Sequence, residues 1–351
     1  MARGLWDTCK TLDRSGDGSG ARARDADGQT ILGCLPALMI GAMSPSEIFA
    51  PWMLGGTTAL VTGGGTGLGK ATALELARCG ACVTIAGRRE DVLAEAAAEI
   101  GELVGAGDAA ADDAAGSGVD GDRGAGDGGA GEVRTVVGDI REPDDARRMI
   151  GAVLERDRRL DLLVNNAGGQ FFSPAELIAA KGWRAVWRLN VEGMLNMAEA
   201  AYDLAFAGGR GGRIVNVTLS PHHGMPGMAH SGAARATVEA LTRELAERWA
   251  GDGVTCSAIA VGTFDTEVMV KYPAPVRAGM SRSVPVQRLG TPPEHAWLVA
   301  LLASPLGGAF SGSTVTLDGA RDNWFGPWPP PGLVDEGGEV PVEERKAPAG
   351  E

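Results

Sequence analysis

Short apolar segments alternate with longer helical patterns from Thr58 to Gly319, and this alternation constrains the fold more than any other feature of the chain. Seven segments have the continuous apolar character of buried strands, at 59–64, 81–89, 133–139, 160–168, 213–218, 254–262 and 313–319. Helical patterns lie between them, at 69–80, near 92–100, and at 143–157, 180–207, 229–250 and 292–303. Buried strands joined by helices predict a single doubly wound α/β domain with a seven-stranded parallel sheet.

Three segments fall outside this pattern, and we expect all three to be disordered. Residues 1–42 show no sustained period, and they are either an upstream extension or a misassigned start. Residues 101–132 hold eleven Gly, eight acidic residues and one Arg, and the tail 329–351 is also acidic. Such segments have too little apolar surface to offset the entropy of ordering them. The domain is therefore predicted at 43–328, with 101–132 as a disordered acidic, Gly-rich insert.

Composition excludes several classes of function. A net charge of −13 disfavours nucleic-acid partners, since that binding depends on Lys and Arg. The sequence contains no apolar run of the eighteen or more residues that a membrane span needs. Five cysteines make a disulfide framework improbable and favour a cytoplasmic location. No grouping of Cys or Asp accompanies His222 and His223, so we expect no metal site.

The strongest chemical signal is the glycine-rich turn from Thr62 to Gly69, between the first predicted strand and the first predicted helix. Glycines let the backbone approach a ligand closely, and the N-terminus of a helix favours an anion such as pyrophosphate. This context predicts a dinucleotide site of the Rossmann type. The expected contacts are Gly63, Thr66, Gly67, Leu68 and Gly69.

Arg88 and Arg89 end the second predicted strand, where an NAD site usually carries a carboxylate for the ribose hydroxyls. Arginine instead suits the 2′-phosphate of NADP(H), which a carboxylate would repel. The sequence therefore predicts NADP(H) as the cofactor.

The chain resembles the short-chain dehydrogenase/reductase family over roughly residues 50–320. The resemblance rests on Thr62 to Gly69, Asn165-Asn166-Ala167-Gly168, Asn190 and Val261-Gly262. It implies that Asp139 and Ile140 border the adenine, that Asn166, Ala167 and Gly168 line the cofactor, and that Thr266 touches the nicotinamide carboxamide. It also implies a homotetramer built on the long helices near 180–207 and 229–250.

One departure from the family decides the predicted chemistry. Members that act on alcohols and ketones use a Tyr-x-x-x-Lys pair, but here Ser231 stands four residues before Arg235. The only tyrosines of the chain are Tyr202 and Tyr272, and neither has the required spacing. A serine hydroxyl is a much weaker acid than a phenol, and arginine stays protonated, so carbonyl reduction would be impaired.

Reduction of a carbon–carbon double bond conjugated to a carbonyl tolerates this loss, because the site needs only donors to the acyl oxygen. Residues 169–176, Lys181-Gly182-Trp183 and 230–236 closely resemble the peroxisomal trans-2-enoyl-CoA reductase branch of the family. An acyl-CoA thioester is thus the expected substrate. We expect Thr218 and Ser231 to donate hydrogen bonds to its carbonyl oxygen and Arg235 to bind the nicotinamide ribose. Asn190 is expected to hold a helix kink and an ordered water, and Tyr272 to be a reserve proton donor.

Two other functions stay open at this point. The chain could be an alcohol or aldehyde dehydrogenase, for example of an acyclic terpenoid alcohol, although the missing tyrosine argues against it. Alternatively, it has lost catalysis and serves as a cofactor-binding scaffold.

Overall fold

The computed structural model describes residues 46, 48–112, 133–220, 227–267, 269 and 284–323. Its centre is one parallel sheet in the order β3-β2-β1-β4-β5-β6-β7, which confirms the predicted fold class. The strands are β1 (Thr58–Thr62), β2 (Cys82–Gly87), β3 (Val133–Val137), β4 (Leu162–Asn165), β5 (Gly212–Leu219), β6 (Val254–Val261) and β7 (Thr314–Leu317). The two strands at the middle of the order, β1 and β4, are buried along their whole length, as expected for a sheet covered on both faces.

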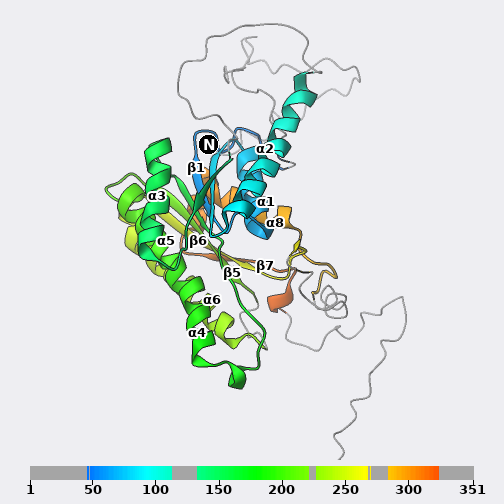
Figure 1. Cartoon of the computed structure of the whole chain (residues 1–351), viewed down its shortest axis with the longest axis vertical. Coiled ribbons are helices and arrows are strands. Elements are labelled where there is room, and N and C mark those ends of the chain that lie inside the picture. The colour runs from blue at the N-terminus through cyan, green and yellow to red at the C-terminus, as the bar shows by residue number, and fades with distance from the viewer. Residues whose placement is uncertain are drawn as a thin grey trace, which may run out of the picture. The chain divides into compact units, whose positions relative to one another are not determined.

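Helices cover both faces of the sheet (Figure 1). One face carries α1 (Gly67–Arg78), α2 (Glu90–Asp112) and α8 (Pro292–Ala303). The other carries α3 (Pro143–Asp157), α5 (Gly193–Ala201) and α6 (Ala229–Trp249). The short α4 (Ala180–Trp187) precedes α5 in the chain and contacts α6. Each face thus has its own hydrophobic core, with the sheet between the two.

The region predicted as a helix at 180–207 is helical from Ala180 to Phe206 and contains two π-helical turns, η2 (Arg188–Glu192) and η3 (Tyr202–Phe206). Asn190 lies in the first of them, and its amide donates to the carbonyl oxygen of Val186 at 2.7 Å. A π turn leaves the regular ladder locally unpaired and often marks a functional site. Here the turn brings the Asn190 side chain to the loop that follows β4.

The start of the predicted disordered insert needs correction, because α2 continues through Asp112 into the segment 101–132. Ile100 and Val104 are both buried, one helical turn apart, so the apolar stripe of the helix extends past the predicted boundary. The alanines at 109–111 also favour helix. Residues 113–132, together with 1–42 and 329–351, lie outside the described residues.

Among the described helices, none is long and apolar enough to cross a membrane. Nor do the described His, Cys, Asp and Glu residues form a group of three or more that could hold a metal ion.

The strand order reverses between β1 and β4, since the chain first adds β2 and β3 on one side and then β4 to β7 on the other. The turns that follow β1 and β4 therefore diverge at the carboxyl edge of the sheet. Open α/β sheets bind their ligands at this point.

Candidate functional site

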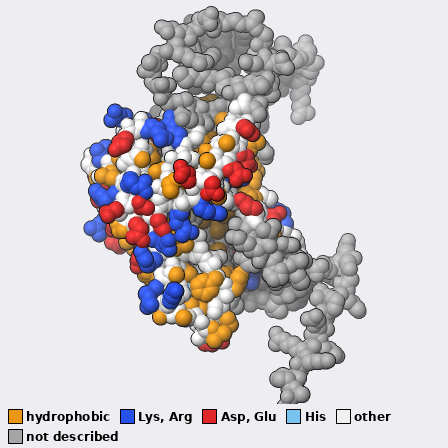
Figure 2. Space-filling model, in the orientation of Figure 1, with side chains coloured by type: hydrophobic (Ala, Val, Ile, Leu, Met, Phe, Trp, Pro, Cys, Tyr) orange, Lys and Arg blue, Asp and Glu red, His pale blue; other side chains and the backbone are white. Residues whose placement is uncertain are grey.

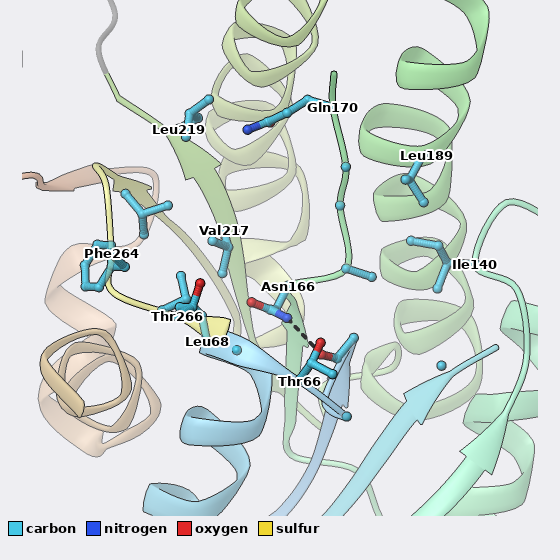
Figure 3. A pocket seen from close by; sticks show the side chains of 18 of the residues that line it. Thr66, Leu68, Ile140, Asn166, Gln170, Leu189, Val217, Leu219, Phe264 and Thr266 are labelled. Carbon is cyan, nitrogen blue, oxygen red and sulfur yellow. Dashed lines mark hydrogen bonds between the residues drawn. The ribbon is translucent and has the colours of Figure 1, made fainter. Parts of the chain in front are cut away.

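A cavity of about 750 Å³ opens at this carboxyl edge, above β1, β2, β4, β5 and β6 (Figure 3). Almost all of the predicted site residues in the described part of the chain line it. They are Gly63, Thr66, Gly67, Leu68, Arg88, Arg89, Asp139, Ile140, Asn166, Ala167, Gly168, Thr218, Arg235 and Thr266. The other three predicted residues in the described part of the chain do not line the cavity; they are Gly69, Asn190 and Ser231.

The glycine turn has the backbone that its sequence demands. Gly63 and Gly67 have φ of 67° and 52°, in the left-handed region that other residues rarely adopt. A Cβ at Gly69 would overlap the carbonyl oxygen of Gly63. This glycine therefore lets the first turn of α1 pack closely against the glycine loop, and its contact with the cofactor stays a prediction.

The turns after β1 and β4 are locked together by hydrogen bonds. The Asn166 amide donates to the carbonyl oxygens of Thr62 at 3.0 Å and Gly63 at 3.3 Å. In return, the Thr62 hydroxyl oxygen accepts from the backbone N–H groups of Asn166 and Ala167, both at 3.1 Å. Asn166 therefore acts by fixing the shape of the glycine turn, and Figure 3 shows its side chain beside that turn.

Beyond the glycine turn, the end of the cavity at β2 and β3 is cationic. Arg88 and Arg89 are exposed at the end of β2. Asp139 is the one carboxylate among the described residues that line the cavity, and it forms an ion pair with Arg141. Hydrogen bonds from Arg141 hold the pKa of Asp139 below its usual value, and the charge of Arg88 adds to this effect. The two arginines that follow β2 thus line the cavity, and the one carboxylate of the described lining near them is paired with Arg141.

At the opposite end, Arg235 enters the cavity from α6. Its Nη1 donates to the carbonyl oxygen of Val217 at 2.8 Å, and burial lowers its pKa to about 10. The guanidinium therefore stays charged at neutral pH. A Cβ added at Gly168 would overlap Arg235 Nη2 and would lie 2.8 Å from Asn190 Oδ1, so this glycine makes room for both side chains.

The side chain of Asn190 makes three hydrogen bonds within the protein. Its amide donates to the carbonyl oxygens of Gly169 at 2.8 Å and Val186 at 2.7 Å, and its oxygen accepts from the backbone N–H of Gly169 at 3.1 Å. Both amide protons are therefore engaged within the protein, and Asn190 holds the loop after β4 against the π turn. That it also holds an ordered water stays a prediction.

The predicted roles of Thr218 and Ser231 also need correction. Thr218 donates its hydroxyl to the Glu239 carboxylate at 3.1 Å, and the buried Ser231 donates to Gln170 Oε1 at 3.0 Å. A hydroxyl has one proton, so in this structure neither is free to donate to a substrate oxygen. Gln170, for which the sequence predicts no role, also lines the cavity. Since Ser231 engages the oxygen of this amide, the nitrogen is left for the cavity, and Figure 3 shows it at the tip of the side chain, toward Leu219.

No tyrosine lines the cavity in the described part of the chain. Tyr202 lies in η3, stacks on Trp249 with ring centroids 4.4 Å apart, and donates its hydroxyl to Asp252 at 2.6 Å. It is therefore a structural residue. Tyr272, the predicted reserve proton donor, lies outside the described residues, as do His222 and His223.

Glu267 is a second residue at the site for which the sequence predicts no role. Its carboxylate accepts a hydrogen bond from the backbone N–H of Gly67 at 2.8 Å, at the N-terminus of α1. Burial raises its pKa, hydrogen bonds such as that from Gly67 lower it, and the net shift is downward. A negative charge thus already lies against the turn that we expect to bind pyrophosphate. The sequence feature that could have indicated Glu267 is its position next to Thr266, which is predicted to contact the cofactor.

Family models match two parts of the chain. The model described as Enoyl-(Acyl carrier protein) reductase matches residues 122–320, and the model described as short chain dehydrogenase matches residues 57–115. Together they cover the sheet from β1 to β7.

Individual relatives agree with this match over most of their length. A probable 2,4-dienoyl-CoA reductase of Bacillus subtilis is 32% identical over 77% of this chain and 97% of its own. A peroxisomal 2,4-dienoyl-CoA reductase of Arabidopsis thaliana is 31% identical over 77% of this chain and 86% of its own. Among solved structures, the citronellol catabolism dehydrogenase AtuB of Pseudomonas aeruginosa PAO1 is 34% identical with a TM-score of 0.64, covering 79% of this chain and 99% of its own.

Proposed function

The chain belongs to the short-chain dehydrogenase/reductase family, and from this premise we propose that it reduces the carbon–carbon double bond of a 2-enoyl-CoA with NADPH. The observation that carries the proposal is the pair Gln170 and Ser231. It directs an amide donor at a cavity in which no described residue is a tyrosine. Such a site suits charge stabilisation on an acyl oxygen better than proton transfer to an alkoxide.

The residues present fit NADPH. The left-handed glycines and the N-terminus of α1 suit a pyrophosphate, and the exposed Arg88 and Arg89 suit a 2′-phosphate. Asp139 does not oppose this assignment, because its charge is paired with Arg141. When bound, NADPH supplies the hydride, and the names of the relatives support an acyl-CoA as its acceptor.

The protein's own part in the reaction is electrostatic. Hydride addition at the β-carbon places negative charge on the thioester oxygen, where the Gln170 amide donates a hydrogen bond that strengthens as the charge grows. Arg235, charged at neutral pH, adds a positive field from beneath the same end of the cavity. Asn190 positions the loop that carries Gln170 through its bonds to Gly169. The α-carbon takes its proton from solvent.

The names of the relatives suggest two other substrates for comparison. The names of the dienoyl-CoA reductases favour a 2,4-dienoyl-CoA as an extended form of the same conjugated substrate. The likeness to the citronellol dehydrogenase favours a terpenoid alcohol. Oxidation of a terpenoid alcohol requires a group that accepts the hydroxyl proton. In this family that group is a tyrosine, and no tyrosine is among the described residues that line the cavity.

A homotetramer and a cytoplasmic location stay predictions. The first is measured by light scattering on the eluting full-length protein and the second by fractionation of the source cells.

The test is a spectrophotometric panel with the full-length protein. We expect NADPH consumption with crotonyl-CoA, (2E)-hexenoyl-CoA and (2E,4E)-hexadienoyl-CoA, and no reduction of NADP⁺ with citronellol or geraniol. Oxidation of the alcohols without turnover of any enoyl-CoA would contradict the proposal. Binding of NADPH without turnover of either class would instead indicate a scaffold.

A further inference from the structure

Beside the cavity, the described surface exposes several large aromatic side chains of a kind that globular proteins usually bury. Phe172 is 57% exposed, Phe171 41% and Trp183 36%. They come from the loop after β4 and from α4, and Figure 2 shows hydrophobic side chains gathered on the end of the molecule where Figure 1 has α4. Exposed apolar patches of this kind commonly mark binding surfaces. We call these three residues the aromatic ledge.

The aromatic ledge is continuous with the cavity. Phe172 lines the cavity and is also largely exposed, so it forms the boundary between the two. Phe171 packs on α4, since a Cβ added at Gly182 would lie 2.8 Å from its ring. The buried ring of His230 joins the remaining members, with its centroid 4.3 Å from that of Phe171 and 6.0 Å from that of Trp183. Ring contacts through His230 thus connect the loop beside the mouth of the cavity to α4.

Hydrogen bonds hold the loop of the ledge at both ends. The backbone N–H of Ser173 donates to the carbonyl oxygen of Gly227 at 2.8 Å, on the far side of the two phenylalanines. On the near side, the Asn190 side chain donates one hydrogen bond to the backbone of Gly169 and accepts another from it. The ledge is therefore preformed, so a ligand does not have to order it on binding.

The ledge follows the proposed carbonyl donor directly in sequence, because Gln170 precedes Phe171 and Phe172. A substrate whose carbonyl accepts from Gln170 therefore lies next to Phe172, since both residues line the cavity. Crotonyl-CoA has a single carbon beyond its double bond and does not extend past the reaction centre, whereas a twelve-carbon chain extends well beyond it. Each methylene buried at such a surface raises affinity for the transition state by about fourfold.

We propose that the aliphatic tail of the substrate lies on the aromatic ledge, so that the enzyme prefers medium- and long-chain enoyl-CoA thioesters over short ones. This inference rests on the proposed function and goes further, since it assigns chain-length selection to Phe171, Phe172 and Trp183. The occupant is the tail rather than a second copy of the chain, because Phe172 belongs to the cavity and the ledge at once.

The test measures kcat/KM of the full-length protein for the C4, C8 and C12 trans-2-enoyl-CoA thioesters, at concentrations at which the thioesters are monomeric. The wild type should prefer C12 over C4 by at least tenfold. Phe172→Ser should reduce the C12/C4 ratio at least tenfold. Phe310→Ser is the matched control, since Phe310 is 37% exposed, precedes the edge strand β7 and does not line the cavity; it should keep the wild-type ratio.

Each other result has a separate meaning. Turnover of C4 with no preference for longer chains would overturn the ledge and leave the proposed function standing. Failure to reduce any enoyl-CoA would refute the proposed function itself. An unchanged C12/C4 ratio in Phe172→Ser, with a smaller assembly in light scattering, would assign the ledge to contact between copies and overturn the inference.

Discussion

The most informative single substitution is Gln170→Ala, because it removes the side chain that we propose as the donor to the acyl oxygen. The amide of Gln170 lines the cavity, and its oxygen is engaged by Ser231 at 3.0 Å. Loss of one preorganised donor to a developing oxyanion costs about 3 kcal/mol, or about a hundredfold to a thousandfold in kcat. We expect a loss of this size in steady-state oxidation of NADPH with (2E)-hexenoyl-CoA.

Ser231→Ala provides the matching test, because Ser231 acts through Gln170. It removes one neutral hydrogen bond worth about 1 kcal/mol, so kcat should fall about fivefold. In the double variant, the loss should equal that of Gln170→Ala alone, since residues that act as a unit are not additive. The NADPH dissociation constant, measured by fluorescence, should stay within twofold of wild type in all three variants. A Gln170→Ala enzyme with kcat within threefold of wild type would refute the reasoning.

Three further predictions concern the cofactor and the core. Replacing both Arg88 and Arg89 by Ala should raise the Kd for NADPH at least tenfold and change that for NADH less than twofold; equal losses would undo the cofactor assignment. Glu267→Gln should tighten NADPH about fivefold in titration calorimetry, because a charge near a helix N-terminus is worth about 1 kcal/mol; weaker binding would show that the carboxylate supports the turn. Burial lowers the pKa of His295 to about 4 from 6.5, so only the unfolded state takes up a proton as the pH falls between these values. The free energy of unfolding, measured with urea, should then fall by on the order of 3 kcal/mol as the pH is lowered from 6.5 to 4. In His295→Gln this dependence on pH should be weaker; an unchanged dependence would assign it to other groups.

The sequence predicted the sheet and the walls of the cavity because these depend on local patterns. Continuous apolar strands required a parallel sheet, and a glycine turn between strand and helix required its position at the carboxyl edge. The spacing of glycines did not distinguish Gly67, which lines the cavity, from Gly69, which packs inside the turn, since both are needed for the same backbone path.

The roles of the polar side chains could not be predicted from the sequence, because they depend on hydrogen-bond partners that are far away in the chain. Ser231 meets Gln170 across 61 positions, and Thr218 meets Glu239 across 21. Composition alone also placed the start of the insert too early, because it weighs Gly and Asp but not the burial of Ile100 and Val104 along one face of α2.

The central claim is that a carbon of the conjugated double bond, rather than the carbonyl carbon, accepts the hydride. The most direct measurement follows deuterium from NADPH labelled at both C4 positions of the nicotinamide into the product of (2E)-hexenoyl-CoA, located by mass spectrometry and NMR. The account predicts hexanoyl-CoA with one deuterium, at C3. Deuterium at C1 of an aldehyde or alcohol product would contradict it.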